Sequence, residues 1–162
     1  MIVLQSSVGN QIETVIVETP SGPIKGLKDV FTETGDTVYE FRGIRYAQPP
    51  TGPLRFKKPE PVGKWTETYD ATSFGAACPQ TSLLYENENL QMSEDCLVLN
   101  VYVPKVLDPG QSLSVMVWIH GGELIMGHAH EYNGGRIAVK GTVIVVTINY
   151  RLGVFGFFAL DH

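Results

Sequence analysis

Long apolar runs are absent from this chain of 162 residues. A run such as Val143–Ile148, which Thr147 interrupts, is far too short to cross a bilayer. The first residues, MIVLQSSVGNQIE, place only three consecutive apolar residues after Met1 and carry no basic residue, so they do not form a signal peptide. We therefore expect no membrane span in this chain.

Basic residues are also scarce. The 12 lysines and arginines are outnumbered by 17 acidic residues, which gives a net charge of −5 and a pI near 5.3. A surface of this sign repels nucleic acid and anionic membranes, so we expect neither as a partner. The composition, 43% apolar and 18% charged, is that of one globular domain and excludes a disordered or collagen-like chain.

Cysteine occurs only twice, as Cys78 and Cys96. Their spacing leaves two interpretations open: two separate buried thiols, or a disulfide that closes the loop between them. A disulfide would stabilise the fold by ~3 kcal/mol through the unfolded state, and it would persist only in an oxidising compartment.

The first part of the chain predicts short antiparallel strands. Thr14–Thr19 and Ile24–Leu27 flank the turn Pro20-Ser21-Gly22-Pro23 and predict a hairpin, and Val38–Phe41 alternates like a third strand. The stretch 47–62 holds so many prolines that regular strand pairing is excluded there.

Three later segments are almost continuously apolar and rich in valine and isoleucine: Leu97–Val103, Leu113–His120 and Thr142–Tyr150. This pattern is typical of strands buried on both faces, as in a parallel sheet covered by helices. Glu131–Lys140 is long enough for a short crossover helix between the last two. The sequence therefore predicts an α/β fold, in which small antiparallel strands precede the first strands of a mostly parallel sheet.

The second of these segments ends at His120, which Gly121 and Gly122 follow. In α/β sheets ligands bind at the carboxyl ends of strands, and glycines let backbone N–H groups approach a ligand closely. Such N–H groups can form an oxyanion hole, which stabilises the negative oxygen of a tetrahedral acyl intermediate. A tight turn that uses glycine only for its φ angles is the alternative, and the dipeptide alone favours the turn.

Other candidates for chemistry are few. His128 and His130, with Glu131, suggest a metal site, but this set lacks the fuller ligand set of a typical one. We expect solvated loop histidines, no metal and no other cofactor. The large aromatic residues are expected to pack in the core: Trp65, Trp118, Phe155, Phe157 and Phe158.

Six stretches, in order, resemble one protein family. They are FRGIRYAQPP (41–50), LRF (54–56), CPQ (78–80), SEDCLVLNVYVP (93–104), the His-Gly-Gly stretch (120–122) and NYRLG (149–153) leading to Gly156-Phe157. Together they resemble the type-B carboxylesterases and cholinesterases of the α/β-hydrolase fold, from about Gly22 to Phe158. The resemblance implies that residues 1–162 are the amino-terminal portion of a single carboxylesterase domain.

The resemblance implies an oxyanion hole. Gly121, Gly122 and Glu123 occupy the family's positions for it, and the N–H groups of Gly122 and Glu123 are the implied donors. A third donor would follow the nucleophilic serine, and His120 would take a supporting position. Glu123 departs from the glycine or alanine that the family prefers. Its carboxylate would repel an oxyanion if it turned inward and would have little effect in solvent.

Two further pairs are implied in the same way. Cys78 and Cys96 match the family's first disulfide, which implies secretion or the ER lumen, with the cytoplasm as the alternative because no signal peptide is present. Arg55 and Glu94 match a buried structural ion pair between the proline-rich segment and the disulfide loop. Arg45 stands where the family usually has proline.

The implied activity is carboxylic-ester hydrolysis through an acyl-serine intermediate, with a small-molecule ester as substrate of the full-length protein. None of the eight serines stands in the Gly-x-Ser-x-Gly frame of the nucleophile, so no catalytic triad is present in this chain. A non-catalytic adhesion or binding protein of the neuroligin type, or an inactive truncated product, is the alternative. The stretch Pro79–Asp95 lacks the tryptophan that binds choline in cholinesterases, which favours the broad-specificity carboxylesterases.

In the fold that the resemblance implies, the segment Val115–His120 becomes a bare sheet edge in this chain. An apolar, uncharged edge promotes association between chains. We therefore expect the isolated chain to be poorly soluble or partly molten.

Overall fold

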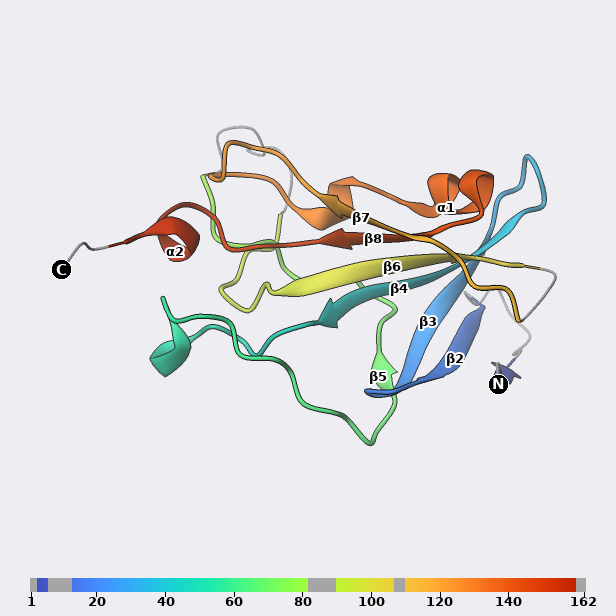
Figure 1. Ribbon diagram of the computed structural model, residues 1–162, viewed down its shortest axis with the longest axis horizontal. Coiled ribbons are helices and arrows are strands. Elements are labelled where there is room, and N and C mark those ends of the chain that lie inside the picture. Colours follow the sequence, from blue (N-terminus) through green and yellow to red (C-terminus); the bar gives the residue numbers. More distant parts are fainter. Residues whose placement is uncertain (1–2, 6–12, 82–89, 107–109, 160–162) are drawn as a thin grey trace.

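The computed structural model describes residues 3–5, 13–81, 90–106 and 110–159. Its eight strands form one twisted sheet in the order β1-β2-β3-β4-β6-β8-β7, with β5 paired to β3 off this path (Figure 1). The strands are β1 (Val3–Gln5), β2 (Thr14–Thr19), β3 (Gly22–Val30), β4 (Thr37–Arg45), β5 (Tyr69–Asp70), β6 (Val98–Pro104), β7 (Val115–Ile119) and β8 (Ile144–Ile148). The helices are α1 (Gly135–Gly141) and α2 (Gly153–Phe157), with 3-10 turns η1 (Gly52–Leu54) and η2 (Ala129–Glu131).

The predicted hairpin is confirmed. β2 and β3 pair antiparallel up to Thr19 opposite Gly22, and β3 then pairs antiparallel with β4. Gly22 has φ +135°, and a Cβ there would lie 2.2 Å from the Trp65 carbonyl oxygen, so only glycine fits the turn. The third strand, predicted at Val38–Phe41, is longer because an irregularity between Phe41 and Ile44 lets β4 continue beside β6.

The expected mostly parallel sheet is wrong for the described residues. β6 runs antiparallel to both β4 and β8, and β7 with β8 is the one long parallel pair there, beside the two-residue pairing of β5 with β3. β6 is apolar along its length except at Asn100, and both of its faces meet apolar clusters. Tyr102 packs with Val38, Ala138 and Val145 on one face. Val101 packs on the other face, against a cluster around Phe41. Burial on both faces therefore does not require parallel neighbours.

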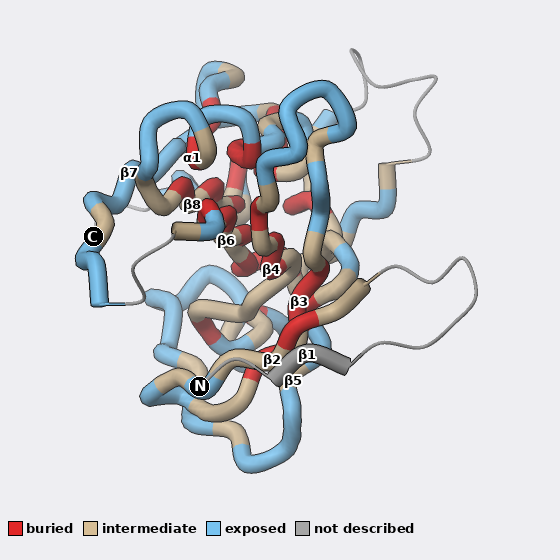
Figure 2. The backbone as a smooth tube through the Cα atoms, turned by 90° about the vertical axis from the view of Figure 1, so that its right-hand side faces the viewer, coloured by how far each residue is buried: buried red, intermediate tan, exposed pale blue. Residues whose placement is uncertain are grey.

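The crossover helix predicted within Glu131–Lys140 is present as α1, which joins the parallel strands β7 and β8. α1 ends at Gly141, and the next residue, Thr142, caps it: with a φ of 51°, its backbone N–H donates to the carbonyls of Ala138 and Val139. Buried residues gather along β4, β6 and β8 (Figure 2).

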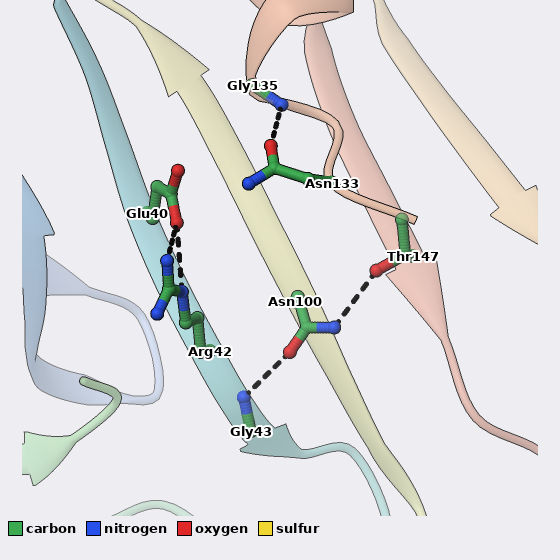
Figure 3. Close-up of polar contacts among 7 residues, drawn as sticks. All are labelled: Glu40, Arg42, Gly43, Asn100, Asn133, Gly135 and Thr147. Carbon is green, nitrogen blue, oxygen red and sulfur yellow. Dashed lines mark hydrogen bonds and ion pairs between the residues drawn. The ribbon is translucent and has the colours of Figure 1, made fainter. Parts of the chain in front are cut away.

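Polar side chains lie on and between the interior strands β4, β6 and β8 (Figure 3). Asn100 on β6 accepts a hydrogen bond from the Gly43 N–H (2.9 Å) and donates one to Thr147 Oγ1 on β8 (3.0 Å). On β4 the buried Glu40 carboxylate accepts a hydrogen bond from Arg42 Nε (2.9 Å). The Asn100 bonds satisfy a buried amide and fix the register of β4, β6 and β8.

β7 forms one edge of the sheet, and its side chains are 48–62% exposed. The expectation that Trp118, Phe157 and Phe158 pack in the core is wrong, since these side chains are 48%, 52% and 59% exposed. Trp118 belongs to the edge strand β7, and Phe157 and Phe158 lie at the end of α2, near the end of the described residues. Among the described residues, no helix is long and apolar enough to cross a membrane.

Candidate active site

The segment that follows β7, residues 120–127, is here named the glycine loop. It begins at the carboxyl end of β7, beside the carboxyl end of the parallel strand β8. Gly122 has φ +109°, and a Cβ there would lie 2.1 Å from the Met126 carbonyl oxygen. Gly127 has φ +113°, and a Cβ there would lie 2.3 Å from His120 Nδ1. The loop therefore needs glycine at both positions for conformation and for space.

His120 anchors the start of the glycine loop. The side chain is buried, and its ring stacks on Tyr150 with centroids 4.5 Å apart. Tyr150 Oη donates a hydrogen bond to the His120 carbonyl (2.8 Å), and burial raises the pKa of this phenol, so it stays a donor. His120 Nδ1 lies 2.8 Å from the Gly121 carbonyl oxygen. Because a carbonyl can only accept, this contact assigns the ring proton to Nδ1.

The loop carbonyls determine where its N–H groups point. A trans peptide is planar, so its N–H points opposite to the carbonyl of the same unit. The Gly121 carbonyl is held by His120, which turns the Gly122 N–H the other way. The Gly122 carbonyl accepts hydrogen bonds from the N–H groups of Ile125 (3.0 Å) and Met126 (3.1 Å), which turns the Glu123 N–H away from these two groups. Among the described residues, neither the Gly122 N–H nor the Glu123 N–H donates to the protein.

Glu123 lies at an open apolar hollow of about 430 Å³. Its side chain is exposed, so in the described structure the carboxylate meets solvent at this hollow. Its φ of 56° and the φ of 64° at Leu124 are left-handed values that side chains disfavour. The Gly153 N–H donates to the Leu124 carbonyl (2.7 Å) and ties the strained turn to the start of α2. The hollow is otherwise lined by Leu124, Ile125, Gly153, Val154, Phe157 and Phe158.

The disulfide between Cys78 and Cys96 is confirmed, with an S–S distance of 2.02 Å and both residues buried. The segment also contacts the glycine loop, which the sequence did not predict. Gln80 Oε1 accepts a hydrogen bond from the Gly127 N–H (2.7 Å), and Gln80 Nε2 donates to the Gly127 carbonyl (2.9 Å). The only available sequence signal was the place of Gln80 in the stretch CPQ.

Two ion pairs flank the disulfide. Arg55 and Glu94 pair as expected, with Arg55 Nε 2.6 Å from Glu94 Oε2. The pair is not buried, because the Arg55 side chain is 47% exposed at the rim of the proline-rich segment. The second pair, Arg45 with Asp95 (Nε to Oδ1, 3.1 Å), was missed. Asp95 raises the pKa of Arg45, and this partner gives a physical reason for arginine at a position where the family usually has proline.

The expectation of solvated histidines at His128 and His130 is wrong. His128 is buried, and the two rings meet edge to face with centroids 4.2 Å apart. Burial, and then the neighbouring His128, lower the pKa of His130 to about 4, so its ring is neutral near pH 7. Among the described residues, no group of three histidine, cysteine or acidic side chains could hold a metal. The one aromatic residue that the sequence places between the two cysteines, Tyr85, lies outside the described residues.

Asn149 completes the support behind the loop. Its side-chain oxygen accepts a hydrogen bond from the Ala129 N–H (2.7 Å), and its amide donates to the Ala76 carbonyl (3.0 Å). The Tyr46 hydroxyl donates to the Asn149 carbonyl (2.8 Å). The end of β8 thereby holds together the segment before the disulfide and the segment after the glycine loop. The arrangement offers two oriented N–H donors, the elements of an anion-stabilising site.

Comparisons with known proteins place this geometry in context. The sequence pattern described as the carboxylesterase family matches residues 13–162. The chain is 48% identical over 151 residues to a para-nitrobenzyl esterase of Bacillus subtilis and 44% identical over 153 residues to a cocaine esterase of Oryctolagus cuniculus. These alignments cover 90% and 89% of this chain but 29% of each relative. A solved thermophilic PNB esterase is similar with a TM-score of 0.77 and 49% identity, over 90% of this chain and 29% of that one.

Proposed function

The chain belongs to the carboxylesterase family and has part of its α/β-hydrolase fold, and from this premise we propose that it is the amino-terminal part of a serine carboxylic-ester hydrolase. In this proposal a serine beyond residue 162 attacks the ester carbonyl, the alcohol leaves, and water hydrolyses the acyl-serine. Residues 1–162 form part of a single domain and supply the oxyanion donors. The relatives named above as esterases support carboxylic esters as the substrate class.

The orientation of the glycine loop is the observation that carries the proposal. The carbonyls of Gly121 and Gly122 are engaged by His120 and by the turn at Ile125, which leaves the N–H groups of Gly122 and Glu123 directed away from these contacts. Donors fixed before the reaction stabilise a developing oxyanion without reorganisation. His120 takes the supporting role, since its Nδ1–H holds the first of these peptides.

The proposal extends to compartment. Cys78 and Cys96 form a disulfide, and such bonds persist in oxidising compartments, so we place the protein in the secretory pathway. Loss of the disulfide on treatment with a mild reductant under cytosolic conditions, without loss of folded protein, would argue for the cytoplasm instead.

Hydrolysis of p-nitrophenyl butyrate by the complete gene product tests the activity. Fluorophosphonate labelling identifies a reactive serine, and its absence would favour the non-catalytic alternative. Gly122→Ala is the matched probe, since the new Cβ meets the Met126 carbonyl at 2.1 Å and φ is +109°. Loss of an oxyanion donor lowers kcat by about 100-fold or more, and we expect that loss here.

Gly63→Ala is the control, because Gly63 has open space around its Cβ direction and no positive φ. We expect this variant to retain kcat within twofold. If Gly122→Ala keeps full kcat while the enzyme is active, the glycine loop is not the oxyanion site.

A further inference from the structure

We propose that Gln80 is a positioning residue that fixes the direction of the oxyanion donors by holding Gly127 against His120. The inference deepens the proposed function and rests on it. The Gln80 side chain makes no hydrogen bond with the N–H group of Gly122 or Glu123, so it acts through the backbone of the glycine loop.

The Gln80 side chain makes the two hydrogen bonds to Gly127 that a neighbouring backbone would make in a sheet. Its amide pairs with both backbone groups of Gly127, accepting from the N–H at 2.7 Å and donating to the carbonyl at 2.9 Å. Gly127 is buried, so its N–H and carbonyl depend on this one side chain for their hydrogen bonds among the described residues. The same Nε2 also donates to the Cys78 carbonyl (3.1 Å), which holds the amide in place from the disulfide side.

Gly127 packs directly on the residue that orients the first donor. A Cβ at Gly127 would lie 2.3 Å from His120 Nδ1 and 2.8 Å from the Gly121 carbonyl oxygen. The His120 ring and the Gly121 carbonyl therefore both pack against the backbone of Gly127. A shift of Gly127 toward or away from them changes where the ring and the carbonyl meet.

A chain of contacts then leads to the donor. Gln80 holds Gly127, Gly127 confines His120, and His120 Nδ1–H holds the Gly121 carbonyl at 2.8 Å. Because the Gly121–Gly122 peptide is planar, the direction of that carbonyl sets the direction of the Gly122 N–H. Gln80 therefore positions a donor with which it shares no contact, and Cys78 anchors the start of the chain.

Gln80→Leu in the complete gene product tests the inference, since leucine is similar in size and makes neither hydrogen bond. Gln91→Leu is the matched control: it makes the same change in the same disulfide loop at an exposed side chain. Two readouts are needed. The first is hydrogen–deuterium exchange of the peptide 119–127, and the second is kcat and KM for p-nitrophenyl butyrate.

We expect Gln80→Leu to speed exchange at the Gly127 amide at least about tenfold and to lower kcat about tenfold, with KM within twofold. Gln91→Leu should leave exchange, kcat and KM within twofold of wild type. A purely structural role for Gln80 would lower thermal stability but leave kcat of the folded protein unchanged, and that result overturns the inference.

Failure of the proposed function is distinguishable from failure of this inference. If the wild-type protein hydrolyses no ester, the proposed function fails, and the exchange readout alone decides whether Gln80 fixes the glycine loop. If the wild type is active and Gln80→Leu changes neither exchange nor kcat, the positioning role is wrong.

Discussion

β6 and β7 are both mainly apolar strands, with Asn100 as the polar residue of β6, but they lie in opposite environments. Along β6 every second residue is buried, and Tyr102 has no exposed surface, whereas all five residues of β7 are 48–62% exposed. β6 has strand neighbours on both sides and apolar clusters on both faces. β7 pairs only with β8 in the described part of the chain. Strand formation therefore needs one hydrogen-bonding neighbour, while burial depends on the layers that pack above and below.

The same substitution in the two environments gives the largest difference. Val38 on β4 packs with Tyr102 of β6 and has no exposed surface, whereas Val117 on β7 is 58% exposed. We expect Val38→Ala to lower the free energy of unfolding of the 162-residue chain by about 2 kcal/mol through lost packing. We expect Val117→Ala to change it by less than about 0.5 kcal/mol. Urea denaturation followed by tryptophan fluorescence measures both values.

Equal losses in the two variants would break the comparison, since they would mean that β7 is covered in solution. A chain too insoluble for the measurement would agree with the expectation that a bare β7 edge promotes association. Repeating the pair in the complete gene product sharpens the point: a rise in the Val117→Ala loss there would show that further residues cover β7.

Burial of His130 also makes the free energy of unfolding depend on pH. His130 has a pKa of about 4 in the folded chain against 6.5 when unperturbed, so the unfolded chain binds a proton between these values that the folded chain does not. The free energy of unfolding therefore falls as pH is lowered through this window and levels off below it. One pKa unit is ~1.4 kcal/mol, and partial exposure reduces the total to about 1.5 kcal/mol.

His130→Phe keeps the ring stacked near Phe74 and removes the titration. We expect the variant to lose this part of the slope when urea midpoints are compared at pH 7 and pH 4.5. An unchanged slope would mean that other groups cause the acid sensitivity.

The exposed region should tolerate change at Glu123, which gives the smallest effect. Glu123→Gly removes a side chain from a φ of 56°, which costs an L-residue about 1 kcal/mol, although glycine also gains freedom in the unfolded chain. The carboxylate is exposed, so we expect kcat of the complete gene product to change by less than about threefold. A rise of 100-fold would show that the carboxylate turns toward the oxyanion in the active enzyme.

Local patterns predicted the local structure. Turn residues marked the β2–β3 hairpin, the prolines between 47 and 62 marked an irregular segment, and α1 lies largely within the predicted crossover. The direction of β6 was not predictable in this way, because its apolar run reports contact on two faces and not the polarity of its neighbours. The burial of Phe157 and Phe158 was mispredicted for the same reason: hydrophobicity alone does not show which element, if any, packs on a side chain.

The candidate site was predictable in position but not in construction. Gly121, Gly122 and Glu123 were predicted as the candidate site because glycines at a strand end let the backbone approach a ligand and because their neighbours resemble one family, and this role stays a prediction. Gln80 and Asn149 were missed because a side chain that substitutes for a backbone partner leaves no periodic pattern. The ion pair between Arg45 and Asp95 shows a similar limit, since these residues are 50 positions apart in sequence.

The contacts of the glycine loop also impose an order in time. During synthesis, His120 and Leu124 leave the ribosome before Tyr150 and Gly153, which supply hydrogen bonds to their carbonyls. Gln80 is made earlier than the loop, whereas the hydroxyl that closes on His120 arrives 30 residues later. Closing such long segments is slow compared with local turns. The loop therefore matures only after β8 has been synthesised and docked, so the N–H groups of Gly122 and Glu123 are among the last groups of this chain to reach their final directions.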